Sequence, residues 1–366
     1  MNNLIFRFFK NFDFVLLGAT LLLLALGLAT LFSATTEYSL SSIAIKQSIN
    51  AAIGLVGLFI LSKIDYRLLK SYTGIMYLIV VSMLVAVKSF GLTVKGAERW
   101  IDLGFTQLQP STLSLLLMVI ILAKYFAENY EELSKPKPIL KSLLYTGIPA
   151  FLIAWQPDLG SAALLIFIWA VMLFISNAKR VYIAFLASIS LLSLPVVWLF
   201  MRDYQKDRVM TFLNPAADPM GAGWNVNQAM IAIGSGQIWG RGLGHGTQSQ
   251  LNYIPEKHTD FIFAMIAEEM GFLGVCILLA LFLIIMYRGA RITTLARDFF
   301  GTYLAIGIIT IYFVHIFINV GMNMGIMPVT GVPLPFISYG GTAVIVNMAG
   351  IGILLSIYRR YKKIDF

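Results

Sequence analysis

The feature that most constrains this chain is a series of long apolar stretches separated by shorter polar segments. A helix needs roughly 20 apolar residues to cross the hydrocarbon part of a bilayer. Of the 366 residues, 58% are hydrophobic and 12% are charged, and a typical soluble domain has about twice that charged fraction. The pattern predicts an all-α polytopic membrane protein that forms a single domain over residues 1–366. About ten transmembrane helices are expected, near residues 14–35, 42–62, 72–90, 111–127, 141–155, 161–177, 181–200, 261–287, 301–320 and 341–358.

Three details of this pattern bear on topology and chemistry. The fifth and sixth stretches are short and meet at residues 156–160, so they form either two spans or one broken pair. The first stretch has no small-residue cleavage site, so we expect it to be retained as an anchor. Cys276 is the single cysteine, which excludes an intramolecular disulfide and a cysteine-based metal site.

Basic residues are distributed unevenly along the chain, whose net charge is +9. If the N-terminus is cytoplasmic, most of the 27 Lys and Arg residues fall in cytoplasmic segments. This is the positive-inside asymmetry that sets membrane orientation, so both termini are predicted to be cytoplasmic. A long segment at residues 201–260, between the seventh and eighth helices, and a shorter one at residues 91–110 then lie outside. Because topology accounts for the basicity, we expect no nucleic-acid partner.

Asp260 lies where the long segment enters the eighth apolar stretch, directly after His258 and Thr259. One interpretation is structural, because a Thr or Asp here can cap the helix by accepting hydrogen bonds from first-turn amides. The other is functional, because a carboxylate at the boundary between lipid and water can act as a base. Both interpretations hold if Thr259 caps the helix and Asp260 points into a cavity.

Two sets of polar residues lie within the apolar stretches. A carboxylate in the membrane is costly unless it is paired or faces water, so we favour a structural partner for Glu268. It lies about 80° around the helix and roughly 12 Å along it from Asp260, too far for the carboxylate pair of a glycosidase. The ninth stretch carries a polar stripe that either bonds neighbouring helices or lines a cavity, formed by His315, Asn319 and Asn323.

Two further segments have unusual compositions. Residues 234–246 are dense in glycine, which suits either tight turns or amides that converge on an anion. Cationic side chains on the same side are Arg99, Arg202, Lys206, Arg208 and Arg241. Residues 328–341 contain three prolines and three glycines, so they cannot form a continuous helix. Irregular backbone at membrane depth must be buried in protein or line a cavity, so we expect a re-entrant or wall-forming element.

Several long motifs resemble those of the SEDS family (shape, elongation, division and sporulation) of bacterial peptidoglycan polymerases, and the likeness covers nearly the whole chain. The matching motifs lie at residues 202–209, 214–224, 231–236, 246–249, 258–263 and 328–341. The sequence of residues 325–335 resembles the elongation branch of the family more than its division branch. The family fold is a ten-helix bundle, in line with the apolar stretches.

The resemblance implies that the chain polymerises lipid II into glycan strands at the outer face of the bacterial cytoplasmic membrane during cell elongation. The essential acid of the family lies in the motif matched here by residues 258–260, which assigns the role of base to Asp260. A pyrophosphate needs no general acid to leave if its charge is neutralised. Arg99 and Arg208 would neutralise it, and a divalent cation (Mg²⁺ or Mn²⁺) is an open alternative.

The resemblance also implies binding residues and partners. The implied substrate-binding residues are Arg99, Gln109, Asp158, Arg208, Gln248, His258, Thr259, Asn319 and Ser338. The implied partners are the lipid II substrate, a class B penicillin-binding protein transpeptidase and other membrane proteins of the elongation complex.

The chain departs from the family pattern at three positions. Where the family has a Glu after Gln-Pro-Ser and a Lys three residues later, this chain has Thr112 and Leu115. Losing acid and base together leaves no orphan charge in the membrane, which indicates that the two normally pair. Gln237 replaces a usual Gly. The alternative functions are a lipid II flippase and a catalytically inactive scaffold for a penicillin-binding protein.

Overall fold

The structure is a computed structural model that describes residues 12–33, 41–94, 97–102, 104, 107–214, 222–251, 253–254 and 256–361. Within these residues, nine helices are long and apolar enough to cross a membrane, and one further apolar helix is shorter. They are α2 (Phe14–Ser33), α3 (Ser41–Lys63), α4 (Thr73–Phe90), α5 (Pro110–Glu128), α6 (Pro136–Trp155), α7 (Leu159–Ile175), α8 (Arg180–Phe200), α12 (Ile262–Leu295), α13 (Phe299–Asn323) and α14 (Gly341–Arg359). The predicted all-α, multi-pass membrane fold is confirmed.

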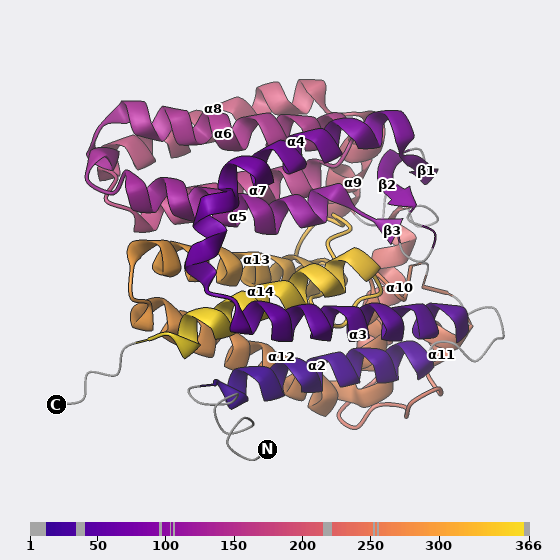
Figure 1. Ribbon diagram of the computed structural model, residues 1–366. Helices are drawn as coiled ribbons and strands as arrows, with labels where there is room; N and C mark the ends of the chain where they lie inside the picture. Colours follow the sequence, from indigo (N-terminus) through magenta and orange to yellow (C-terminus); the bar gives the residue numbers. More distant parts are fainter. Residues whose placement is uncertain are drawn as a thin grey trace, which may run out of the picture.

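The long helices run side by side across the bundle (Figure 1). α14 packs along α3, while α13 packs against α5 and α12, and α2 packs against α12. α4 and α7 also pack against α5, α7 packs against α13 as well, and α6 packs on α7. α13 and α14 are the most deeply buried of the spans. The core therefore lies between these two helices and α5.

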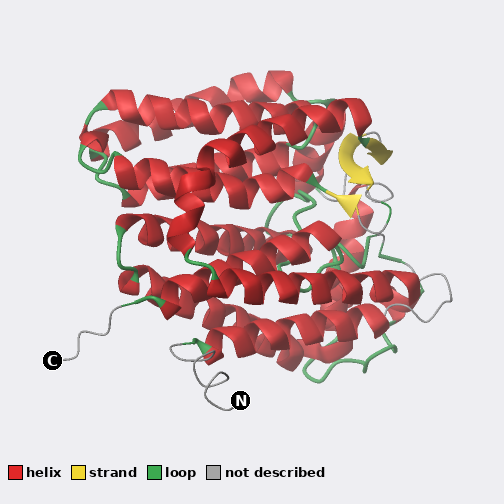
Figure 2. Ribbon diagram, viewed as in Figure 1, coloured by secondary structure: helices red, strands yellow, loops and turns green. Residues whose placement is uncertain are grey.

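Short elements gather at one end of the bundle, which we call the loop-rich end (Figure 2). The strands β1 (Leu92–Val94), β2 (Ala97–Asp102) and β3 (Gln107–Leu108) form an antiparallel sheet in that order. The predicted long segment contributes α9 (Asp203–Leu213), α10 (Ala222–Ser235) and α11 (Thr247–Gln250). Most of the 214–224 motif lies outside the described residues. At the opposite end, the 3-10 helices η1 (Tyr66–Tyr72) and η2 (Glu132–Ser134) connect the spans.

The structure settles two points of the predicted pattern. α6 and α7 are separate helices of 20 and 17 residues that pack on each other as a hairpin, so the fifth and sixth stretches form two helices, of which α7 is too short to be counted among the nine long apolar helices. The eighth span is longer than expected, because α12 continues to Leu295. It is also kinked at Gly271, which has φ 64°. A Cβ there would lie 2.2 Å from the backbone nitrogen of Gly240, so only glycine fits.

The first turns of α12 hold the glycine-dense segment by hydrogen bonds. The Glu268 carboxylate accepts from the backbone amides of Gln248 at 2.8 Å and Ser249 at 3.0 Å. The Glu269 carboxylate accepts from the Ser33 hydroxyl at 2.7 Å and the Gly244 amide at 3.2 Å. The structural role favoured for Glu268 agrees with this geometry. Within the segment itself, the Gly244 amide donates to a carboxylate, whereas the Arg241 and Gly242 amides donate to the backbone carbonyls of Glu268 and Glu269.

Residues 328–340 form no helix and cross the interior of the loop-rich end between α13 and α14. Val332, Leu334, Phe336, Ile337 and Ser338 are buried. The predicted irregular, buried wall element is therefore present.

A buried ion pair joins the neighbouring helices α2 and α12 at the end opposite the loops. The Asp13 carboxylate caps α2 by accepting from the Leu16 amide at 3.0 Å, and it pairs with Arg288 of α12 at 2.7 Å. Asp13 is only 2% exposed. Removing one partner of such a pair leaves an uncompensated buried charge.

Replacing Asp13 with Ala should lower the free energy of unfolding by about 3 kcal/mol. Glu128→Ala, which removes the half-exposed pair with Lys70, is the matched control and should cost less than about 1 kcal/mol. Thermal denaturation of the purified protein in detergent measures both. Asp13→Ala/Arg288→Met should recover part of the loss, and equal effects of the two single variants would contradict the prediction.

Candidate active site

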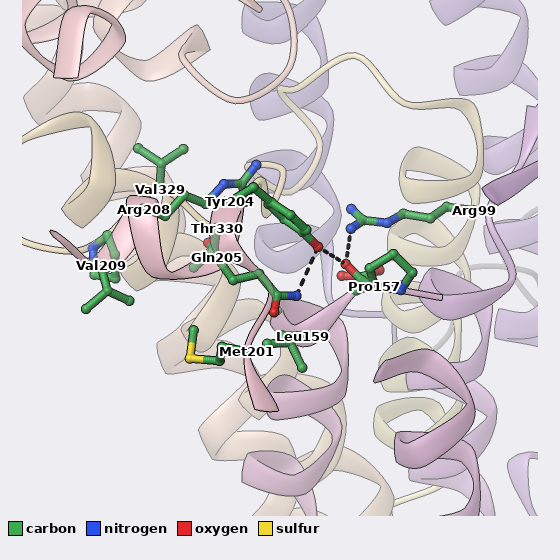
Figure 3. Close-up of a pocket in the computed structure, with 13 residues that line it drawn as sticks. Arg99, Pro157, Leu159, Met201, Tyr204, Gln205, Arg208, Val209, Val329 and Thr330 are labelled. Atoms are coloured by element: carbon green, nitrogen blue, oxygen red, sulfur yellow. Dashed lines mark hydrogen bonds between the residues drawn. The ribbon is translucent and has the colours of Figure 1, made fainter. Parts of the chain in front are cut away.

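A cavity of about 110 Å³ opens at the loop-rich end between the α6–α7 turn, α9 and the start of the 328–340 segment (Figure 3). It brings together Arg99 from β2, Asp158 from the start of α7 and Arg208 from α9. These residues are far apart in the sequence, and all three are predicted substrate-binding residues. Of the five cationic side chains that the sequence places on this side, the structure brings Arg99 and Arg208 together at one cavity.

The α6–α7 turn fixes Arg99 at the edge of this cavity. Its Nε donates to the Gln156 carbonyl at 3.3 Å, and its terminal Nη2 donates to the Pro157 carbonyl. The Tyr204 hydroxyl donates to the same Pro157 carbonyl at 2.9 Å (Figure 3). Arg208 lies one helical turn after Tyr204, and its guanidinium is 5.9 Å from the centre of the Tyr204 ring. The two cations are thus held on opposite sides of one tyrosine.

Asp158 borders the cavity, but both of its carboxylate oxygens have partners. Oδ1 accepts from the Ser161 amide at 3.2 Å and caps α7, and Oδ2 accepts from the Ser111 hydroxyl at 3.2 Å. The residue is 6% exposed. Its position is that of a structural cap, and neither arginine forms an ion pair with a carboxylate among the described residues. The charged residues that line the cavity are thus two arginines and one carboxylate, which gives a net positive charge.

A second, smaller cavity of about 40 Å³ continues from the same residues into the bundle. Gln109, Thr112, Leu115 and His315 line it, together with Arg99 and Asp158. The Thr112 hydroxyl donates to Gln109 Oε1 at 2.9 Å, and Leu115 is buried. Two of the three positions that depart from the family pattern, Thr112 and Leu115, thus line this cavity with neutral side chains.

Three polar atoms at this second cavity are buried without a hydrogen-bond partner among the described residues. They are both ring nitrogens of His315 and the Thr330 hydroxyl, although the Pro333 carbonyl lies close to the ring. Buried polar groups in native proteins usually have a partner, and a cavity of this size has room for water. We therefore expect water here, consistent with a cavity-lining position for His315.

The backbone of residues 258–260 is fixed at all three of its carbonyl oxygens. The His258 carbonyl accepts from the Tyr339 amide at 2.8 Å, and the Thr259 carbonyl accepts from the Ser338 hydroxyl at 2.7 Å. The Asp260 carbonyl accepts from the side-chain amides of Asn319 at 3.1 Å and Asn323 at 2.9 Å. The structure thus gives Asn319 and Ser338 a backbone-holding position, and neither lines the described cavities.

The Asp260 side chain is half-buried and lies against the wall of the second cavity. Its Oδ2 is 3.5 Å from the point that a Cβ on Gly331 would occupy. Gly331 and Thr330 line the cavity, whereas Asp260 does not. Gly331 has φ +76°, a backbone conformation that favours glycine. The lining residue next to the carboxylate therefore has no side chain.

The remaining predicted residues lie near Asp260 or in the glycine-dense segment. His258 does not line the described cavities; burial, with a smaller contribution from Lys257, lowers the pKa of its imidazole to about 4, so the ring is neutral at neutral pH. The Thr259 hydroxyl donates to the Glu256 carbonyl at 3.3 Å. The Gln248 backbone is bonded to Glu268, away from the cavities.

Sequence reasoning did not single out Tyr204, Gln205 or Thr330. Tyr204 and Gln205 lie within the 202–209 motif, and the Gln205 amide donates to the Tyr204 hydroxyl at 2.9 Å. The spacing of Tyr204 and Arg208 on one helix face was the available signal. Thr330 lies in the 328–341 motif, but its unpartnered hydroxyl is visible only in three dimensions.

No group of three or more His, Cys, Asp or Glu side chains with metal-binding geometry occurs in the described part of the chain. A divalent cation at this site would therefore need other ligands in addition to protein carboxylates. Mg²⁺ is commonly bound by one or two carboxylates plus substrate phosphates, and Asp260 could serve as such a ligand beside the cavity wall.

Comparison with known proteins places the chain in a family. The family model described as "Cell cycle protein", covering FtsW, RodA and SpoVE, matches residues 13–363. Peptidoglycan glycosyltransferase MrdB of Escherichia coli (strain K12) is 41% identical over 96% of both chains.

Two solved structures are similar. A chain of a peptidoglycan synthase complex that coordinates polymerization and crosslinking has a TM-score of 0.82 and 29% identity over 95% of this chain and 98% of that one. A point mutant of the rod shape determining protein RodA of Thermus thermophilus has a TM-score of 0.69 and 25% identity over 96% of this chain and 99% of that one. The predicted likeness to the elongation branch is confirmed. The chain belongs to the FtsW/RodA/SpoVE family of cell cycle proteins, which is the SEDS family.

Proposed function

We propose that this protein is a peptidoglycan glycosyltransferase that polymerises lipid II during cell elongation. The single observation that carries the proposal is the placement of Asp260 against the wall of the second cavity, which shares Arg99 with the adjoining cavity that Arg208 lines. A transfer reaction with a pyrophosphate leaving group needs a base and positive charge, and this arrangement supplies both. The relatives named as peptidoglycan glycosyltransferases support the same activity.

In the proposed reaction, the C4 hydroxyl of an acceptor GlcNAc attacks C1 of a donor MurNAc. A C1–O4 bond forms, the bond from C1 to the pyrophosphate oxygen breaks, and undecaprenyl pyrophosphate leaves with the bonding electrons. Asp260 takes the hydroxyl proton. Arg99 and Arg208 stabilise the charge that develops on the pyrophosphate, so no general acid is needed.

Asp260 would help to hold a divalent cation, which would supply further neutralisation of the negative charge on the leaving group. The proposed ion is Mg²⁺ or Mn²⁺, because both prefer oxygen ligands. It would bind together with the substrate, since the protein alone offers few carboxylates at this point.

The proposed location is the bacterial cytoplasmic membrane, with both termini cytoplasmic and the loop-rich end outside. The positive-inside distribution of Lys and Arg supports this orientation. The proposed partners are a class B penicillin-binding protein and other membrane proteins of the elongation complex. The likeness to a chain of a peptidoglycan synthase complex supports such an assembly.

Replacing Asp260 with Asn, which keeps the shape but removes the base, should lower the lipid II polymerisation rate about 100-fold or more. Asp203→Asn, on an exposed acid at the same end of the bundle, is the matched control and should leave the rate within about twofold, because it lies outside the cavities. Gel analysis of glycan strands made from labelled lipid II by the purified protein measures both. An unchanged rate for Asp260→Asn would contradict the role of Asp260 as base, whereas the absence of polymerisation by the wild type would support the inactive-scaffold alternative.

Replacing Asn319 with Ala should lower kcat about tenfold or more with little change in KM, because it releases the Asp260 backbone and misplaces the base. Thr310→Ala is the control, since Thr310 lies on the same helix and bonds only the Ile306 carbonyl of that helix. Initial rates over a range of lipid II concentrations separate the two parameters. A raised KM with unchanged kcat would instead indicate that Asn319 contacts the substrate.

Chelation with EDTA should abolish most polymerisation, and added Mg²⁺ or Mn²⁺ should restore it. Calorimetric titration of the ion into protein without lipid II should detect no tight binding, because the pyrophosphate supplies most of the ligands. Full activity in EDTA would remove the ion from the mechanism and leave the arginines as the only cations.

A further inference from the structure

A large apolar groove lies between α6 and α8 at the end of the bundle opposite the candidate active site. Its volume is about 650 Å³, within the roughly 300–1,000 Å³ typical of sites that bind small ligands. The walls are Ile139, Leu140 and Leu143 of α6 and Val181, Phe185 and Leu186 of α8. Residues three and four apart share a helix face, so each helix turns one apolar face toward the other.

α8 depends on something outside the chain to fill this groove. None of its residues is buried, and among the helices it packs mainly on α7. Phe185 is 62% exposed although it lines the groove. An apolar space that opens on the membrane is filled by hydrocarbon, because leaving it empty forfeits the packing contacts of its walls.

The rim of the groove carries an excess of positive charge. Lys137 lines the groove, and the other exposed cations lie within two residues of lining residues in the sequence: Lys135, Lys141, Lys179 and Arg180. None of the five forms an ion pair with a described residue. The acids of the same two connections are Glu131 and Glu132. The connections lie together, since the Ser134 hydroxyl donates to the Asn177 carbonyl at 3.5 Å.

We propose that this groove binds an anionic phospholipid of the phosphatidylglycerol type. One acyl chain lies between α6 and α8, and the phosphate lies on the rim near Lys137 and Lys179. Lys and Arg residues next to a membrane attract anionic lipids in preference to zwitterionic ones. The site is separate from the cavities at the loop-rich end, and its occupancy does not depend on the proposed enzymatic activity.

Binding at this groove would affect the position of α9. α8 continues through Met201 directly into α9, which supplies Tyr204, Gln205 and Arg208 to the candidate active site. A lipid that fills the groove holds α8 against α6. The lipid therefore reduces the freedom of these three residues without touching them.

Native mass spectrometry of the purified full-length protein, with dioleoylphosphatidylglycerol or dioleoylphosphatidylcholine added, tests the binding. The wild type should retain phosphatidylglycerol about tenfold better, as expected for two or more rim cations. Lys137→Gln/Lys179→Gln should lose this preference, whereas Arg291→Gln/Arg297→Gln, which removes two exposed cations elsewhere at that end, should keep it. Equal retention of both lipids by the wild type would mean annular lipid only and would overturn the proposal.

The groove itself is tested by filling it. Leu140 and Leu144 lie one turn apart on α6 and are 59% and 58% exposed, but only Leu140 lines the groove. Leu140→Trp should reduce phosphatidylglycerol retention at least fivefold, whereas Leu144→Trp should not. Equal retention of phosphatidylglycerol by the two variants would overturn the assignment of the occupant. Loss of phosphatidylglycerol only when two copies of this chain associate would also overturn it.

The position of α8 gives a second readout, which does not depend on measuring the amount of bound lipid. After Cys276→Ser, spin labels at the exposed Leu192 of α8 and Phe151 of α6 report the distance between the helices. Phosphatidylglycerol should narrow the distance distribution of the otherwise wild-type protein and leave that of the Leu140→Trp variant unchanged. Identical distributions in both lipids would contradict a lipid that holds α8.

Discussion

A non-helical segment inside a membrane protein must satisfy its backbone polar groups without water, and this requirement organises the loop-rich end. The Asn319 side chain donates to the Val332 carbonyl at 2.8 Å, and the Ser338 hydroxyl accepts from the Leu334 amide at 2.8 Å. Gln47 of α3 donates to the Ser338 carbonyl at 3.1 Å and accepts from the Gly340 amide at 3.2 Å. The segment thus has helix-borne partners on two sides.

The same polar side chains connect this segment to the candidate base. Asn319 and Ser338 each bond both the 328–340 segment and the backbone of residues 258–260. A change in the segment would therefore move the Asp260 carboxylate and the cavity wall together. Three other acids of this end have structural roles, because their carboxylates accept hydrogen bonds from amides or hydroxyls: Asp158, Glu268 and Glu269. The net charge at the cavity edge is therefore positive.

The fold could be predicted almost completely from the sequence, but the site only in part. Apolar length alone located all ten helices, because lipid permits few other structures. It underestimated α12, whose last two turns extend past the predicted end of the span. The convergence of Arg99, Asp158 and Arg208 could not be predicted, because it depends on how β2, the α6–α7 turn and α9 meet. The roles of Asn319 and Ser338 could not be predicted either. The sequence of an apolar stretch does not distinguish a polar residue that binds ligand from one that bonds the backbone.

In the proposed complex, one cavity edge holds the pyrophosphate while Asp260 faces the sugar. A cryo-EM structure of the protein with undecaprenyl pyrophosphate and an acceptor sugar would show this arrangement. Pyrophosphate density is expected between the guanidinium groups of Arg99 and Arg208, with an acceptor hydroxyl within hydrogen-bond distance of the Asp260 carboxylate. Pyrophosphate bound on the glycine-dense segment, or an acceptor out of reach of Asp260, would contradict it.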